Sequence, residues 1–314
     1  MEPIGESIKK LSGGNFEKRL EALMQEVLQD ERIQKFLARN PGLASAQIER
    51  QLNDLFQFKK EWEHCDSCPG LENCPNLMNG FQPELKMYRD DIHISYHPCP
   101  LKRKADERKR QASFIKSLYI PKEIVAVTFK DIDPDNESRV DAIEKALKFS
   151  HGVVPGEDGK GLYITGKFGV GKTYLMGAVS NALAERKIES MIIYTPDFFR
   201  ELKQGIADGS YQDKLETVKR VPVLILDDIG AETMSAWVRD EILGALLQYR
   251  MMEKLPTIFT SNYDLEDLEA HLTYTQKGGV ENIEELKAKR IMERIRHLNE
   301  EVYMDGVNRR TYNN

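Results

Sequence analysis

The sequence has no apolar run long enough to span a membrane, and outside one short segment it has no cysteine. The chain of 314 residues contains four cysteines, all between Cys65 and Cys99. A membrane-spanning helix needs about 20 mostly apolar residues in succession, and the first residues lack the basic and apolar regions of a secretory signal. We therefore expect a cytoplasmic protein, in which structural disulfides are not expected.

A large excess of charge of one sign is also absent. The chain has 45 Lys and Arg against 51 Asp and Glu, so the formal net charge is −6. No global positive field attracts nucleic acid, and any contact with DNA has to use local basic patches. Hydrophobic residues make up 40% of the chain, which is ample core material for a soluble protein. The length suggests about two domains of ~150 residues.

The first part of the chain is predicted to be helical. Apolar residues recur at three-and-four spacing from Phe16 to about Leu37, and Asn40-Pro41-Gly42 breaks this pattern. A second helix follows, with Ile48 and Phe56 near the ends of its apolar face. Such faces are typical of a small core, although docking into a partner's groove uses the same spacing. The charged run 102–110 indicates a solvated helix or tether, with phosphate contact as the alternative.

From about residue 140 onward, short apolar runs alternate with helical patterns. This alternation predicts a parallel β-sheet that is covered by helices on both faces. The expected strands are Leu162–Thr165, Met191–Thr195, Val223–Leu226 and Thr257–Thr260, and the expected helices include Val140–His151, Lys172–Arg186 and Trp237–Met252.

One loop in this part fits the phosphate-binding pattern G-x-x-x-x-G-K-[ST] and directly follows the strand Leu162–Thr165. In such a loop, glycines let backbone N–H groups surround phosphate oxygens at the start of a helix. Lys172 is expected to reach the β- and γ-phosphates of a nucleotide, and the Thr173 hydroxyl to ligate Mg²⁺. The predicted nucleotide-binding residues are Gly166, Lys167, Phe168, Gly169, Val170, Gly171, Lys172, Thr173 and Tyr174.

Polar side chains follow two further strands. Asp227 and Asp228 come after four apolar residues, at the end of a strand where open α/β sheets bind ligands. We predict that Asp227 holds the same Mg²⁺ as Thr173, and that Asp228 orients or deprotonates the attacking water. Glu232 is the alternative base. Asn262 follows the next strand, and its amide is predicted to reach the γ-phosphate or the attacking water.

These motifs together resemble a known family. Gly166–Thr173, Val223–Asp228 and Thr260–Asn262 are similar to the phosphate-loop, Mg²⁺-binding and first-sensor motifs of AAA+ ATPases. The segments Ser117–Pro121 and Asp227–Glu232 narrow the resemblance to the helicase-loader branch, the DnaC/DnaI-like family, which also includes transposon-helper ATPases. The resemblance implies an ATPase, weak on its own, that loads the hexameric replicative helicase onto single-stranded DNA. It also implies self-association into an ATP-dependent oligomer.

The resemblance further implies roles for single residues. In the segment 289–296, Arg294 is the first choice for an arginine finger that acts on a neighbouring subunit, and Arg290 is the second; a basic amphipathic helix is the alternative. Arg309 resembles the second sensor. Contacts with DNA are expected in Tyr194–Arg200 and at Lys203, where aromatic side chains could stack on bases and cations could follow phosphates. The alternative is that Phe198 and Phe199 are core residues, and we expect one of the two to be.

The four cysteines are predicted to hold a structural zinc ion. Cys65, Cys68, Cys74 and Cys99 are four thiolates in a reducing compartment, which is the donor set of a closed tetrahedral site. His64 or His97 could replace one ligand, and free buried thiols are the alternative.

The sequence thus predicts an α/β AAA+ P-loop ATPase domain preceded by a small, mainly helical zinc-binding domain. We divide the chain into a helicase-interaction domain (1–104), a charged linker (105–135) and the ATPase domain (136–314). The rival functions are a transposition-helper ATPase and a DNA-binding regulatory module in which the nucleotide is only structural.

Overall fold

The computed structural model describes the backbone of residues 15–89, 91–274 and 281–309. The chain divides into two compact units, Met1–Arg108 and Lys109–Asn314. Each unit has a hydrophobic core of its own. Among the described residues, none of the helices is both long enough and apolar enough to cross a membrane.

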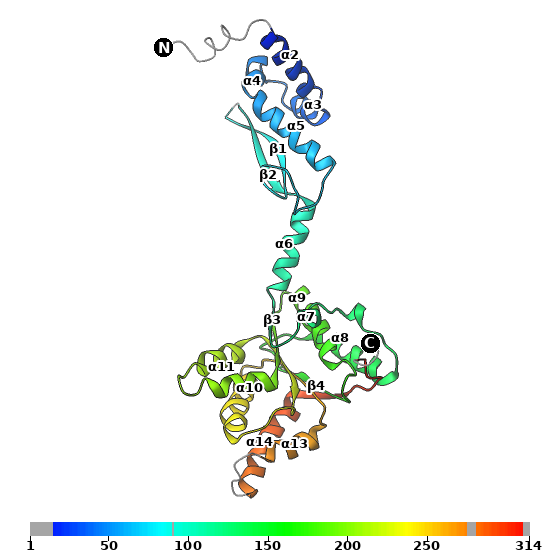
Figure 1. Cartoon of the computed structure of the whole chain (residues 1–314), viewed down its shortest axis with the longest axis vertical. Coiled ribbons are helices and arrows are strands. Elements are labelled where there is room, and N and C mark those ends of the chain that lie inside the picture. The colour runs from blue at the N-terminus through cyan, green and yellow to red at the C-terminus, as the bar shows by residue number, and fades with distance from the viewer. Residues whose placement is uncertain (1–14, 90, 275–280, 310–314) are drawn as a thin grey trace. The chain divides into compact units, whose positions relative to one another are not determined.

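In the described residues, the first unit packs the helices α2 to α5 with a β-hairpin (Figure 1). Its core includes Val27, Ile33, Leu55 and Ile92, none of which is exposed. The helices are α2 (Asn15–Leu28), α3 (Glu31–Arg39), α4 (Ser45–Arg50) and α5 (Leu52–Asp66), and the antiparallel strands are β1 (Phe81–Tyr88) and β2 (Asp91–Pro98).

Two sequence expectations for this unit need correction. The helix predicted from Phe16 to about Leu37 is divided between α2 and α3, because the Asp30 carboxylate accepts hydrogen bonds from the backbone N–H groups of Arg32 (2.8 Å) and Ile33 (3.2 Å) and starts a new helix. The β-hairpin was not predicted. The signal that would have indicated it is the alternation of apolar and polar residue types from Phe81 to Met87, in which the apolar Leu85 is buried.

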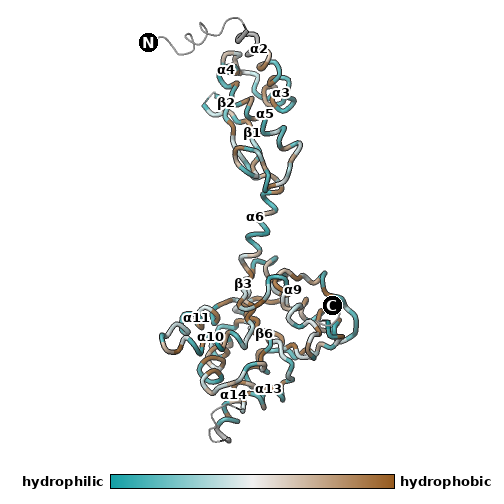
Figure 2. Tube along the Cα trace, in the orientation of Figure 1, coloured by the Kyte–Doolittle hydropathy of each residue, from teal (hydrophilic) through white to brown (hydrophobic). Residues whose placement is uncertain are grey.

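The charged run lies in the helix α6 (Pro100–Ala112), which has no buried residue. Figure 2 shows α6 as hydrophilic along its length, whereas hydrophobic residues gather on the strands of the second unit. The charged run therefore forms a helix with solvated side chains, as its charge pattern indicated. A helix that is polar on all sides is typical of a connection between domains.

The second unit is built on a six-stranded sheet in which every neighbouring pair of strands is parallel. Two edge strands, β3 and β8, were not predicted from the sequence, and β3 lies inside the predicted linker. In spatial order the strands are β3 (Ile115–Leu118), β5 (Ser190–Tyr194), β6 (Val223–Ile229), β7 (Thr257–Ser261), β4 (Gly161–Thr165) and β8 (Asn299–Tyr303). Because β4, β6 and β7 are neighbours, the three predicted motifs follow strands that end at one edge.

Helices cover both faces of this sheet, as the alternation predicts (Figure 1). Ile164 and Ile225 belong to the core on the face of α8 (Glu137–Gly152) and α9 (Lys172–Glu185), next to α7 (Lys122–Val125) and the 3-10 turn η1 (Phe129–Asp131). Tyr163 and Leu226 belong to the opposite core. That face carries α10 (Thr195–Gln204), α11 (Tyr211–Arg220), the π-helical segment η2 (Val238–Gly244), α12 (Ala245–Met252), α13 (Leu265–Thr273) and α14 (Glu281–Leu298).

Candidate functional site

The phosphate-binding loop connects β4 to α9 and turns sharply at its glycines. Gly166 and Gly169 have φ angles of +155° and +78°, which side-chain-bearing residues rarely adopt. A Cβ atom at Gly166 would also collide with the carbonyl oxygen of Met304, and one at Gly169 with the Asn308 side chain. Only glycine therefore fits these two positions, and the loop backbone stays close to the segment after β8.

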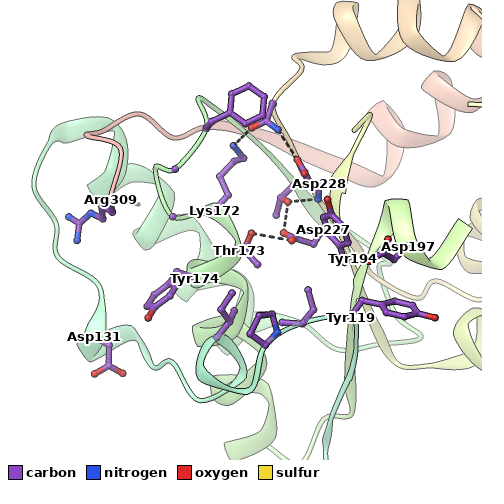
Figure 3. A pocket seen from close by; sticks show the side chains of 18 of the residues that line it. Tyr119, Asp131, Lys172, Thr173, Tyr174, Tyr194, Asp197, Asp227, Asp228 and Arg309 are labelled. Carbon is purple, nitrogen blue, oxygen red and sulfur yellow. Dashed lines mark hydrogen bonds between the residues drawn. The ribbon is translucent and has the colours of Figure 1, made fainter. Parts of the chain in front are cut away.

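The Lys172 side chain is buried at the centre of the site (Figure 3). Its Nζ donates hydrogen bonds to the carbonyl oxygens of Gly166 (2.6 Å) and Lys167 (3.0 Å) and to Oδ1 of Asn262 (2.8 Å). The amide nitrogen of Asn262 in turn donates to Oδ1 of Asp228 (2.7 Å). The loop amine, the predicted sensor amide and the predicted base thus form one continuous chain of polar groups.

The Asp227 carboxylate lies beside this chain, 3% exposed. It accepts hydrogen bonds from the hydroxyl groups of Thr173 (3.1 Å) and Thr260 (2.6 Å). Thr260 Oγ1 also accepts the backbone N–H of Asp228 (2.9 Å), a residue with φ of +59°. Burial raises the pKa of Asp227 to about 6, against the hydrogen bonds that favour its charged form. A buried carboxylate next to a threonine hydroxyl suits a hard divalent cation such as Mg²⁺.

These groups open into a cavity of about 850 Å³. Of the predicted residues, the loop contributes Phe168, Gly169, Gly171, Lys172, Thr173 and Tyr174 to its wall. Asp227, Asp228, Asn262 and Arg309 complete the predicted set. The remaining loop residues, Gly166, Lys167 and Val170, are not part of the wall, and the first two offer their carbonyl oxygens to Lys172.

Comparisons with known proteins agree with this geometry. A family model described as "Primosomal protein DnaI N-terminus" matches residues 1–96, and one described as "IstB-like ATP binding protein" matches residues 102–312. The replicative helicase loader DnaI of Bacillus subtilis (strain 168) is 44% identical over 312 residues, which cover 99% of each chain. The chain belongs to the DnaI family.

Solved structures support the same family for the second unit. A crystal structure of DnaI covers 64% of this chain and 99% of its own, with 48% identity and a TM-score of 0.55. A putative primosome component from Streptococcus pyogenes serotype M3 covers 64% of this chain and 98% of its own, with 37% identity and a TM-score of 0.54. The α/β fold with a parallel sheet and a P-loop-type domain of the AAA+ class is therefore the fold of this DnaI family member.

Three predicted residues, Arg309, Glu232 and Arg294, lie away from the centre of the nucleotide cavity or are engaged elsewhere. Arg309 lines the cavity, but its guanidinium pairs with the carboxylates of Asp133 (3.1 Å) and Asp135 (2.8 Å). Glu232 is buried outside the cavity wall, where burial raises its pKa to about 7. Arg294 is half-buried on α14 and donates to the carbonyl oxygen of Gly244 (2.9 Å). Of the two candidates for the general base, Asp228 lines the cavity and Glu232 does not.

The predicted DNA segment also differs from expectation. Phe198 and Phe199 are both buried in the core against the sheet, so neither is available to stack on a base. Their apolar side chains form the inward face of α10. Arg200 is exposed, whereas the Nζ of Lys203 donates to the carbonyl oxygen of Thr233 (3.2 Å). The cations of this segment remain candidates for DNA contact, and the expectation of phenylalanine stacking is wrong.

Sequence reasoning missed Arg139, a buried arginine beneath the phosphate-binding loop. Its guanidinium donates to the carbonyl oxygens of Val170 and Asp133, the latter at 2.7 Å. It lies 3.3 Å from the position that a Cβ atom of Gly171 would occupy. Helical spacing in α8 gives no hint of this role, because the contact joins residues that are 31 positions apart.

The four cysteines of the first unit lie around one cavity of about 160 Å³, together with His64 but without His97. None forms a disulfide. The backbone N–H groups of Gly80 and Lys102 donate to the sulfur atoms of Cys74 (3.3 Å) and Cys99 (3.4 Å). Among the described residues, no three Cys, His, Asp or Glu side chains lie close enough together to coordinate a metal ion. Zinc binding by these cysteines therefore stays a prediction.

The pKa of Asp227 gives a testable pH dependence. The pKa rises from about 3.9 in an unfolded chain to about 6 in the folded protein, so the ionised carboxylate destabilises the nucleotide-free fold. This cost is absent at low pH and grows as the pH rises through 6. We expect the free energy of unfolding of Asp227→Asn to rise by about 1 kcal/mol relative to that of the wild type between pH 5 and pH 8. Urea unfolding measures this difference.

The buried carboxylate of Glu232 supplies the matched control. The free energy of unfolding of Glu232→Gln should rise relative to that of the wild type in the same way but at slightly higher pH, because the pKa of Glu232 is raised to about 7. Adding Mg²⁺ and ATP should remove the pH trend that depends on Asp227 and leave the trend of Glu232. An Asp227→Asn variant whose stability runs parallel to the wild type from pH 5 to pH 8 would contradict the account.

Proposed function

We propose that this protein is an ATP-dependent loader that delivers the hexameric replicative DNA helicase onto single-stranded DNA when replication starts or restarts. The observation that carries the proposal is the similarity to a replicative helicase loader over 99% of both chains, which includes the first unit as well as the nucleotide cavity. An ATP-binding site alone would be compatible with many activities. The similarity of both units is what points to helicase loading.

The side chains at the cavity suit ATP hydrolysis. Backbone N–H groups of the phosphate-binding loop and the Lys172 amine would hold the β- and γ-phosphates, in place of the carbonyl oxygens and Asn262 amide that Lys172 now contacts. Mg²⁺, held by Thr173 and Asp227, would neutralise charge on the phosphate oxygens. Asp228, which lines the cavity, would accept a proton from water, and Asn262, hydrogen-bonded to it, would orient that carboxylate.

Self-association would complete the site with an arginine from a neighbouring subunit. The sequence favoured Arg294, but its bond to Gly244 docks α14 on η2 within the same chain. Arg290 is exposed on the same helix and makes no ion pair or hydrogen bond in the described part of the chain. This exposure supports Arg290 as the residue that crosses to the next nucleotide. Its guanidinium would stabilise charge on the transferring phosphoryl group.

Single-stranded DNA would be bound through cations of α10 and α11. Arg200 and Lys214 are exposed on these two helices, which lie side by side on one face of the sheet. Contacts to phosphate groups need no particular base, which suits a loader that acts at many sequences. We expect the affinity to fall steeply as the salt concentration rises.

The first unit would bind the helicase, with zinc as its structural ion. Four free thiols line one cavity, and two of the sulfur atoms already accept backbone N–H bonds, as metal-bound thiolates commonly do. Zinc would draw the sulfur atoms together and fix the segment between α5 and β1. The Asn76 amide, which donates to Cys65 (3.3 Å) and to the carbonyl oxygen of Phe81 (3.0 Å), supports the same arrangement.

The proposed function predicts that the protein co-purifies with the replicative helicase and that ATP strengthens the complex. Lys172→Ala should bind ATP at least about 100-fold more weakly, because a charge-assisted contact to phosphate is lost. Its helicase complex should then no longer respond to ATP. Affinity capture followed by mass determination measures both effects, and Arg290→Ala and Arg294→Ala in the same assay separate the two finger candidates. Failure of the wild type to capture helicase, with or without ATP, would contradict the function.

Removing the metal tests the role of the first unit separately. We expect one zinc per purified chain, and we expect Cys68→Ser to lose both the zinc and the helicase complex. ATP affinity should be unchanged, because every residue around the nucleotide cavity belongs to the second unit. A metal-free chain that is folded by circular dichroism and still captures helicase would contradict the zinc proposal.

A transposition-helper ATPase is less well supported. The IstB-like family model matches residues 102–312, whereas the DnaI model accounts for residues 1–96. A regulatory module with a structural nucleotide is the other rival. Turnover of ATP with and without single-stranded DNA distinguishes it, because a purely structural site would show none.

A further inference from the structure

Tyr119 has an unusual backbone conformation at one end of the nucleotide cavity. It directly follows the edge strand β3 and has φ of +63°, which is an outlier for a bulky side chain. Ile120 precedes Pro121, so Ile120 itself is restricted to extended backbone and cannot relieve this conformation. Backbone strain of this kind persists only where surrounding contacts hold it, and it is often found at functional sites.

The contact that holds Tyr119 comes from α10. Its hydroxyl donates a hydrogen bond to the carboxylate of Glu201, whose other oxygen accepts from Lys214 of α11. One carboxylate therefore joins the segment after β3 to both helices. The hydrogen bond to Glu201 raises the pKa of Tyr119 to about 12, and Lys214 and Tyr119 lower the pKa of Glu201. At neutral pH the contact is thus a phenol bound to an ionised carboxylate, which is stronger than a neutral hydrogen bond.

The first turn of α10 also lies at the cavity. Tyr194, the residue before α10, pairs with Asp227 in the sheet register. Both Tyr194 and Asp197 line the cavity. Figure 3 shows Tyr119, Tyr194 and Asp197 at one end of the cavity and Arg309 at the other, with Lys172 and Thr173 between them. Two points of α10, its first turn and Glu201, are therefore linked to groups that a bound nucleotide would face.

We propose that Tyr119 is a positioning residue that couples the nucleotide cavity to α10 and α11, so that ATP changes the affinity of these helices for single-stranded DNA. The inference rests on the function proposed above, because it needs α10 and α11 to be the DNA-binding helices. A nucleotide in the cavity fixes the wall that Tyr119 and Tyr194 form. Through Glu201, the same wall fixes the orientation of Lys214. By linkage, DNA must then strengthen ATP binding by the same factor.

Binding of fluorescein-labelled oligothymidylate to the full-length protein tests this coupling. The measured quantity is the ratio of oligonucleotide affinities with and without ATP and Mg²⁺, read by fluorescence anisotropy. For the wild type we expect a ratio of roughly 5 to 150, the usual range of allosteric coupling. Tyr119→Phe removes only the hydroxyl, and we expect its ratio to fall to about 1 while its affinity without ATP is unchanged. Thermal unfolding checks that the variant is folded.

Tyr211→Phe is the matched control. Tyr211 begins α11 and packs against Trp237, and in the described part of the chain its hydroxyl makes no hydrogen bond. This variant should keep the wild-type ratio. Glu201→Gln removes the charge from the same contact, and we expect the double variant with Tyr119→Phe to lose no more coupling than Tyr119→Phe alone. Because the readout is a ratio, the general effect of removing a negative charge on DNA binding cancels.

The outcomes separate this inference from the function on which it rests. A Tyr119→Phe variant with the wild-type ratio overturns the coupling role and leaves helicase loading and DNA binding intact. A reduced ratio in Tyr211→Phe as large as that in Tyr119→Phe also overturns it, because the effect would then not depend on the contact with Glu201. A wild-type chain that binds no oligonucleotide in either condition contradicts the DNA-binding part of the proposed function, and the coupling falls with it.

Discussion

We propose that the nucleotide site depends on the buried carboxylate of Asp227. A parallel sheet brings the carboxyl ends of β4, β6 and β7 to one edge, so that Thr173 and Thr260 both reach this carboxylate from neighbouring segments. Burial makes its negative charge costly, and two neutral hydroxyl groups compensate only in part. A bound divalent cation removes that cost. Folding thus prepares a charge that Mg²⁺ bound with ATP would neutralise, and we propose that this is how the architecture favours the nucleotide-bound state.

The central strands and the spacing of the motifs were predictable from the sequence because they depend on local patterns. Apolar runs at Val223–Leu226 and Thr257–Thr260 mark strands that are buried on both faces, and the elements follow these bounds within a few residues. The strands in turn bring Lys172, Asp228 and Asn262 together, since parallel neighbours end at one edge. The phosphate-loop pattern and the polar residues that follow the strands, combined with the alternation of short apolar runs and helices, predict this part of the site.

The features that escaped prediction arise from long-range contacts or from weak local signals. Thr260 joins the two aspartates through a hydroxyl that spacing alone cannot assign, and Tyr119 meets Glu201 across 82 positions. The edge strand β3 is only four residues long and half-exposed, so its composition resembles a linker. Phe198 and Phe199 could not both be assigned to the core from the sequence, because a short stretch of aromatic and basic residues is found on DNA-binding surfaces and on amphipathic helices alike. Burial, which the sequence does not specify, decides between them.

The most direct measurement of the central claim is a crystal structure of the full-length protein with Mg²⁺ and a non-hydrolysable ATP analogue. The account predicts a triphosphate in the cavity with its magnesium beside Thr173 and Asp227. It also predicts that the Lys172 amine moves from the carbonyl oxygen of Gly166 to the phosphates. A nucleotide bound elsewhere on the chain, or one in the cavity whose magnesium lies far from Asp227, would contradict it.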